Sequence, residues 1–204
     1  MKKMLAFLGL SLIAIVPLWP QTKPQPSKNR EVLALYETFV IVDERLRQLE
    51  HHSQQLDKDL KPFLESDSAL NQLTRAAMLV GALKAWIPEI RDLVAEEDSL
   101  ITKLVTSSAG LTGDSGRHAD EGIRLLREQH VYLKQSLDHM ERLVEQMLEL
   151  FRTIREDRLA DLPELLDERQ FAAELKAIEE LDQKQELVLA RAKDAFLRLK
   201  ATLK

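Results

Sequence analysis

The sequence contains no cysteine among its 204 residues. This absence excludes disulfide bonds, thiolate metal sites, a cysteine nucleophile and the lipidated cysteine of a lipoprotein. Turn-forming and aromatic residues are also scarce, with 6 glycines, 7 prolines and 5% aromatic residues. Because leucine, alanine, glutamate, lysine and arginine are abundant instead, the composition predicts a mostly helical chain.

Catalytic motifs are absent as well. The chain has no P-loop, no glycine fingerprint for dinucleotides, no Gly-x-Ser-x-Gly and no His-Glu-x-x-His. No glutamate lies three residues before any histidine, whereas di-iron bundles need that spacing to direct both ligands inward. A net charge of -5 and the lack of a long basic run argue against nucleic acid as a partner. We therefore expect no enzyme, no metal and no cofactor.

The N-terminus has the layout of an export signal or a membrane anchor. A short basic start precedes an uncharged apolar run over residues 4–19, and the segment after it offers no pair of small residues for cleavage. We expect residues 1–20 to form a signal peptide or, preferably, an uncleaved anchor in the inner or cytoplasmic membrane. Residues 21–30 read as a proline-rich linker. The positive-inside rule then places the remainder on the periplasmic or extracellular side.

From residue 31 onward, apolar residues recur at spacings of three and four, which is typical of helices with a seven-residue period. Turn-forming segments near residues 66, 107–116 and 161 divide the pattern. We predict an all-α fold, an up-down-up-down antiparallel four-helix bundle with coiled-coil-like seams and helices over 31–63, 68–107, 118–159 and 162–204. Pro88 is expected to kink or split the second helix. An elongated two-chain coiled coil is the rival, but the second helix has too broad an apolar face for one neighbour.

A polar layer is predicted in the middle of this bundle. Folding the second and third helices back about the 107–116 turn places Glu97 opposite His130, the single polar rung of each ladder. The same register adds Leu35 and Ala192 from the outer helices. A buried carboxylate or imidazole is tolerated when it is hydrogen-bonded, so the pair is interpreted as a layer that fixes helix register. A pH-responsive switch and a metal or small-ligand site are the alternatives.

A second group of polar residues interrupts the apolar periodicity of the fourth predicted helix. Asp182 and Gln185 interrupt the ladder of the fourth helix, opposite Leu137 and Met140 in the expected register and close to Pro88. They indicate either a partly solvated edge helix or a small polar cavity that binds something.

Four apolar residues lie off the main ladder of the first helix, at helical spacing. They are Leu33, Tyr36, Val40 and Ile41. Scattered exposed apolar residues are ordinary, but a group at this spacing also fits a partner or dimer surface.

Taken together, the sequence favours a membrane-tethered or secreted helical binding or scaffold protein of the cell envelope. It would act through contacts with another envelope protein or through self-association, and would meet the membrane through residues 4–19 if these are retained. The alternative is a small-ligand or pH-sensing bundle that uses the layer of Glu97 and His130.

Overall fold

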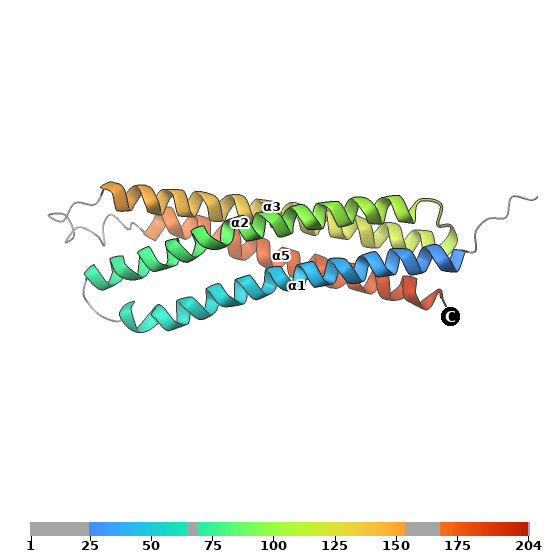
Figure 1. Ribbon diagram of the computed structural model, residues 1–204, viewed down its shortest axis with the longest axis horizontal. Coiled ribbons are helices and arrows are strands. Elements are labelled where there is room, and N and C mark those ends of the chain that lie inside the picture. The colour runs from blue at the N-terminus through green and yellow to red at the C-terminus, as the bar shows by residue number, and fades with distance from the viewer. Residues whose placement is uncertain (1–24, 65–68, 154–167, 204) are drawn as a thin grey trace, which may run out of the picture.

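The computed structural model describes residues 25–64, 69–153 and 168–203, and the expected leader over residues 1–20 lies outside them. The described part is all-α and consists of four helices: α1 (Gln25–Leu64), α2 (Ala69–Ser108), α3 (Gly113–Thr153) and α5 (Glu168–Ala201). Consecutive helices run in opposite directions, and Figure 1 shows them lying side by side along their length. The contacts follow the order α1–α2–α3–α5, as in an up-down bundle. The predicted fold class is thus confirmed at this level.

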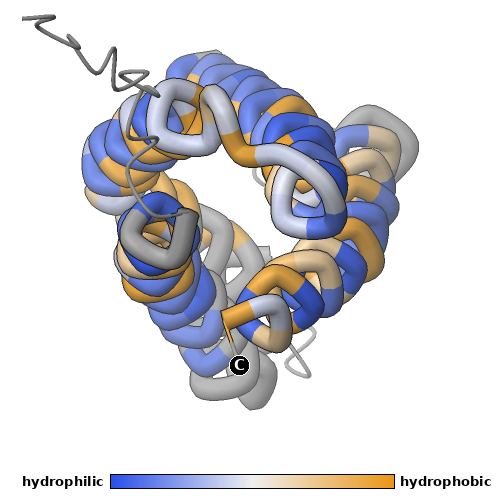
Figure 2. The backbone as a smooth tube through the Cα atoms, turned by 90° about the vertical axis from the view of Figure 1, so that its right-hand side faces the viewer, coloured by the Kyte–Doolittle hydropathy of each residue, from blue (hydrophilic) through white to orange (hydrophobic). Residues whose placement is uncertain are grey.

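The four helices surround a common axis, but one neighbouring pair, α1 and α5, packs less closely than the others. Figure 2 looks along the bundle and shows the helices grouped around a common axis. The pairs α1/α2, α2/α3 and α3/α5 pack closely, whereas α1 and α5 touch at only a few points. Within the described residues, no helix carries a stretch long and apolar enough to span a membrane.

The core has two parts. The larger part lies toward the α2–α3 turn and includes Val32, Phe39, Leu104, Leu126 and Leu199. The second part joins the middle of α2 to α3 and includes Val80, Ile87, Val94, Leu137 and Val144. Such apolar stripes, buried on every helix, supply most of the stability of a bundle because helix propensity alone contributes little.

Helix α1 begins earlier than the sequence suggested. Residues 25–30 were expected to be linker, but α1 starts at Gln25. Pro26 is compatible with this start because the amide groups of a first turn have no partner within the helix. Asn29 is buried, and its Nδ2 donates hydrogen bonds to Ser115 Oγ (3.0 Å) and Thr202 Oγ1 (3.2 Å). These bonds join the start of α1 to α3 and to the end of the chain.

The turn between α2 and α3 is shorter than expected. Helix α3 starts at Gly113 rather than at residue 118, so residues 109–112 make the turn. Gly110 has φ 87° and Gly113 has φ 64°, and this left-handed backbone is accessible to glycine without a steric cost. Lys28 Nζ donates to the carbonyl of Ala109 (2.9 Å) and ties the turn to α1.

Pro88 does not split its helix. Helix α2 runs without interruption from Ala69 to Ser108, with Pro88 inside it. A proline removes one helical hydrogen bond, and packing of Ile87 and Ile90 on either side of it into the core holds the two halves together.

The relative heights of the helices also differ from the expected register. Leu35 was expected level with Glu97, but α1 brings Asp43 near Glu97 instead. Helix α5 is displaced as well, because Asp182 contacts Ser136, one turn before the expected Met140. The observed register of α1 against α2 brings Glu31 to the end of α2 near the α2–α3 turn, where Ser107 Oγ donates to it (2.8 Å).

Candidate functional site

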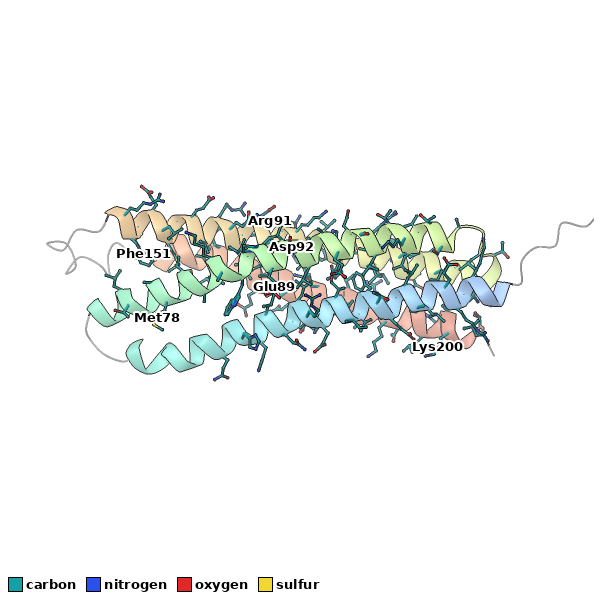
Figure 3. The ribbon with its side chains drawn as sticks, viewed as in Figure 1. Met78, Glu89, Arg91, Asp92, Phe151 and Lys200 are labelled. Atoms are coloured by element: carbon teal, nitrogen blue, oxygen red, sulfur yellow. The ribbon has the colours of Figure 1, made fainter. Side chains whose placement is uncertain are left out.

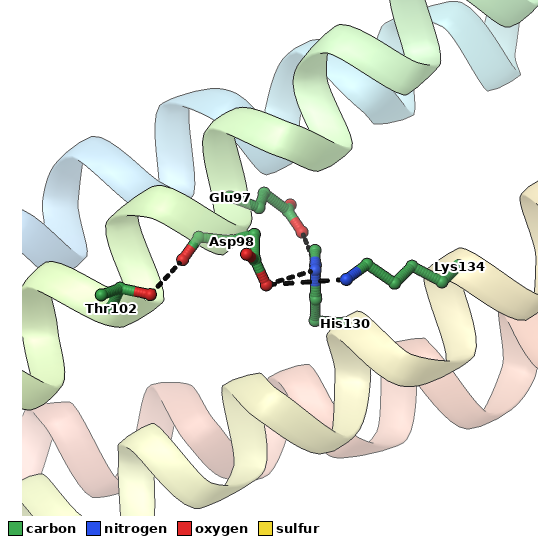
Figure 4. Close-up of polar contacts among 5 residues, drawn as sticks. All are labelled: Glu97, Asp98, Thr102, His130 and Lys134. Carbon is green, nitrogen blue, oxygen red and sulfur yellow. Dashed lines mark hydrogen bonds and ion pairs between the residues drawn. The ribbon is translucent and has the colours of Figure 1, made fainter.

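The structure brings Glu97 of α2 and His130 of α3 together in the bundle interior. Glu97 is 0% exposed and His130 is 4% exposed. His130 Nδ1 lies 3.4 Å from Glu97 Oε2, while its Nε2 lies 3.2 Å from Asp98 Oδ1. Lys134 Nζ is 3.6 Å from the same Asp98 oxygen, and Figure 4 shows the imidazole held between the two carboxylates. Nδ1 is within hydrogen-bonding reach of Glu97, whereas Nε2 makes no hydrogen bond and approaches Asp98 only as a charged neighbour.

The surroundings of Glu97 shift its pKa in opposite directions. Burial raises the pKa of Glu97, the hydrogen bond to His130 lowers it, and the carboxylate of Asp43 raises it further, with a net upward shift. Burial likewise raises the pKa of Asp43, although Arg47 Nε lies 3.0 Å from Asp43 Oδ2 and acts against this shift. Glu97 Oε1 has no hydrogen-bond partner. The layer therefore contains more acid than His130 alone can neutralise.

Asp43 is a member of this layer that sequence reasoning missed. It follows Val42 of the apolar ladder directly, so its own position gave no sign that it turns inward. It is identified only when the position of α1 along α2 is known.

Asp182 and Gln185 do lie beside a cavity. Gln185 Nε2 donates to Asp182 Oδ1 (3.2 Å), and Ser136 Oγ of α3 donates to the same oxygen (3.4 Å). The cavity has a volume of about 120 Å³ and is lined by side chains from all four helices, with Trp86 and Ile90 next to Pro88 among them. Asp182 and Gln185 are both half-buried at the wall of this mostly apolar cavity, a position that fits either interpretation.

The four apolar residues of α1 have different environments. Leu33 is buried in the core, and Tyr36 is half-buried with its ring stacked on Phe196 of α5 at 4.0 Å and 12°. They are not exposed as expected, because α5 covers that side of α1 near the chain ends. Val40 is 42% exposed and Ile41 63% exposed. Val40 lines a groove of about 480 Å³ between α1 and α5, together with parts of Leu33 and Tyr36, whereas Ile41 lies outside that groove.

A second histidine contact had no counterpart in the sequence analysis. His139 Nδ1 of α3 contacts Glu174 Oε2 of α5, and Arg142 Nε lies 3.4 Å from Glu174 Oε1. The hydrogen bond from His139 is the main reason why the pKa of Glu174 is lowered. The spacing of His139 and Arg142 by three places both on one helix face, which is the signal that could have indicated a shared partner.

Within the described helices, no three or more histidine or carboxylate side chains gather closely enough to hold a metal ion. Comparison with protein-family models, with curated proteins and with solved structures finds no match for this chain.

Proposed function

We propose that this chain is a helical binding or scaffold protein of the cell envelope, tethered or exported through residues 4–19, that acts through protein–protein contacts. The supporting observation is the groove between α1 and α5, the neighbouring helices that pack least closely around the bundle. The proposed occupant is an amphipathic helix of a partner protein, seated in the groove as an additional helix of the bundle.

The dimensions of the groove suit such a helix. Its lining extends along α1 from Leu33 to Arg47 and along α5 from Lys200 back to Glu186. At 1.5 Å per residue this length is about 20 Å, or about four turns of a partner helix. Val40 and Leu197, which are 42% and 54% exposed, present apolar surface that a partner would cover.

The charges along the groove define the chemistry of the partner. The α1 edge is mainly acidic, with Glu37, Asp43 and Glu44 beside Arg47, and the α5 edge is mainly basic, with Lys193 and Lys200 beside Glu186. A complementary helix would therefore carry an apolar stripe with basic residues on one flank and acidic residues on the other.

Site-specific photo-crosslinking in the native cell tests this proposal. A photoreactive residue at position 40 and, in a separate variant, at position 197 should trap the same partner protein. The matched control is position 131, because Val131 is 50% exposed on α3 and does not line the groove. Adducts of the chain with itself would instead assign the groove to self-association. Adducts of equal yield and identity at position 131 would reject the groove as the contact surface.

A second candidate function, an acid-responsive bundle, is supported by the imidazole of His130 between two carboxylates. The charged groups around it are Asp43 from α1, Glu97 and Asp98 from α2, and Lys134 from α3. Protonation of the ring would strengthen its contacts with both carboxylates.

Urea denaturation of residues 25–204 at pH 5 and pH 7.5 tests this candidate, with and without His130→Leu. A sensor requires the effect of the leucine to differ between the two pH values. Equal effects at both, or a simple gain in stability from leucine, would reject it.

A further inference from the structure

The charged residues along the groove between α1 and α5 are spaced by heptads. On α5, Lys200, Lys193 and Glu186 follow one another at intervals of seven residues, and all three line the groove. On α1, Glu37 and Glu44 are also seven residues apart and line the groove. A spacing of seven returns a side chain to nearly the same helix face. The charges therefore form two rows, the α5 row and the α1 row, on the two sides of the groove.

Ion pairs cross the groove at two levels. Lys200 Nζ lies 4.0 Å from Glu37 Oε1, near the end of α5 (Figure 3), and Arg47 Nη1 lies 3.9 Å from Glu186 Oε1. Arg47 Nε is also 3.0 Å from Asp43, so α1 carries little net charge at this level. The side chains of the two crossing pairs are 42–73% exposed. Pairs this exposed add little to stability, and their charges are accessible to an incoming helix.

The order of these charges distinguishes one placement of a partner helix from the others. The α5 row is basic at its first two positions and acidic at Glu186, whereas the α1 row is acidic throughout. If a partner helix were reversed with its apolar stripe still in the groove, its flanks would exchange and its acidic flank would meet the α1 row. A shift by one heptad, about 10 Å, would place like charges opposite each other at Glu186 or at Lys193.

We infer that the groove accepts its partner helix in a single direction and register. The partner places two acidic residues and then a basic residue, at heptad spacing, against the α5 row, and basic residues against the α1 row. This inference rests on the proposed function, because it specifies how the proposed partner helix is seated. Charges at the rim of an interface act mainly on specificity and on the rate of association, and exposed rows such as these are suited to that role.

Exchanging the charges of one crossing ion pair tests the inference. Glu37→Lys combined with Lys200→Glu keeps opposite charges across the groove but reverses the charge that each helix offers to a partner. In the full chain in the native cell, the yield of adduct from a photoreactive residue at position 40 should fall at least about threefold. The control is Glu121→Arg combined with Arg198→Glu, which exchanges an exposed ion pair of 3.1 Å between α3 and α5 outside the groove. Equal adduct yields from the two exchanges would overturn the inference.

A single substitution keeps the test independent of the paired exchange. Lys193→Glu changes one exposed residue in the middle of the α5 row and should lower the adduct yield at least about twofold. Lys184→Glu is its control, because Lys184 is exposed on α5 and does not line the groove. Limited proteolysis identifies chains that remain folded. A folded Lys193→Glu chain with the adduct yield of its control would also overturn the inference.

Mapping the attachment sites measures direction and register. Photoreactive residues at positions 197 and 190, which are exposed in the groove and seven residues apart, should each attach within one turn of a single partner residue. The two attachment sites should lie about seven residues apart, in one order only. Attachment in both orders, or spread over more than a heptad, would overturn this inference and leave the proposed function standing. No adduct at positions 40 and 197 of the unaltered chain would overturn both.

Discussion

At the scale of single residues, Glu97 makes one contribution to the pH dependence of stability. Its pKa is raised in the folded state, mainly by burial, so ionisation is less favourable in the folded chain than in the unfolded chain. Its contribution is therefore most favourable below the pKa of the unfolded state and is lost as pH rises through the raised folded pKa.

Replacing Glu97 with glutamine should consequently increase stability more at pH 7.5 than at pH 4.5. The expected gain at pH 7.5 is on the order of 1 kcal/mol, the scale of one unfavourable buried polar group. Urea denaturation at both pH values measures it. Glu96→Gln is the matched control, because Glu96 is exposed and lies 3.8 Å from Arg45. Equal shifts for both variants would show that burial of Glu97 is not the cause.

The close packing at Gly122 leads to a second prediction for a single residue. A Cβ atom at position 122 would lie 2.6 Å from the ring of Phe196, which is itself stacked on Tyr36. Gly122→Ala should therefore destabilise the chain by about 1–3 kcal/mol, although alanine is the better helix former.

Gly81→Ala provides the comparison, because no atom lies within 4 Å of a Cβ built there. It should stabilise the chain by up to about 1 kcal/mol. Thermal unfolding of both variants gives the two signs, and a gain from both would mean that the ring of Phe196 can move aside freely.

At the scale of helices, the first two turns of α1 are bonded to the start of α3 and to the end of α5. Asn29 bonds to Ser115 and Thr202, and these two hydroxyl groups lie 2.9 Å apart. If residues 25–30 were linker, chains starting at residue 25 and at residue 31 would be equally stable. The structure predicts that the shorter chain is less stable.

Asn29→Ala in the longer chain should reproduce most of that loss, by about 1–3 kcal/mol, because it removes a hydrogen-bond donor to the buried hydroxyl of Ser115. Differential scanning calorimetry measures the difference. Arg30→Ala, at an exposed neighbouring position, should leave the transition in place.

The contact of His139 with Glu174 links α3 to α5 with the opposite pH dependence. The pKa of Glu174 is lowered in the folded state, so its contribution is present above the unfolded pKa and is lost as pH falls through the folded value. Glu174→Gln should destabilise the chain at pH 7, and the difference from the unaltered chain should shrink as the pH falls below 4.5, as followed by circular dichroism. Glu180→Gln, which removes only an exposed pair with Lys176 of the same helix, should show little effect at either pH.

At the scale of the whole molecule, the distance between α1 and α5 within one chain distinguishes a four-helix bundle from a two-chain coiled coil. Glu37 of α1 and Lys200 of α5 have side-chain atoms 4.0 Å apart and are exposed. Because the chain lacks cysteine, spin labels can be attached at introduced cysteines alone. Labels at positions 37 and 200 should lie within about 20 Å, as expected for neighbouring helices.

Labels at positions 37 and 149 should be separated by more than about 30 Å along the bundle, and they control for collapse of the chain. Pulsed electron resonance on a diluted mixture of labelled and unlabelled chains gives both distances. A short distance between positions 37 and 200 that disappears on dilution would indicate pairing between chains.

The sequence was sufficient for the number and direction of the helices, because apolar periodicity and turn residues are local signals. It also paired Glu97 with His130, since a short turn leaves few registers for two adjacent helices. It did not locate Asp43 in the same layer or place Asp182 against Ser136. Those positions depend on how far each outer helix slides along its neighbour, and a repeating apolar ladder fits several such positions almost equally well.

The beginning of α1, the α2–α3 turn and the end of α5 lie at one end of the bundle (Figure 1). Should residues 4–19 occupy a lipid bilayer, this end would stand next to the lipid and the opposite end would project about 60 Å from it. The groove would then begin about 12 Å above the start of α1 and reach about 33 Å, at 1.5 Å per residue. A partner for it would have to offer its helix at that height, as a membrane protein does with a helix that continues beyond the lipid surface.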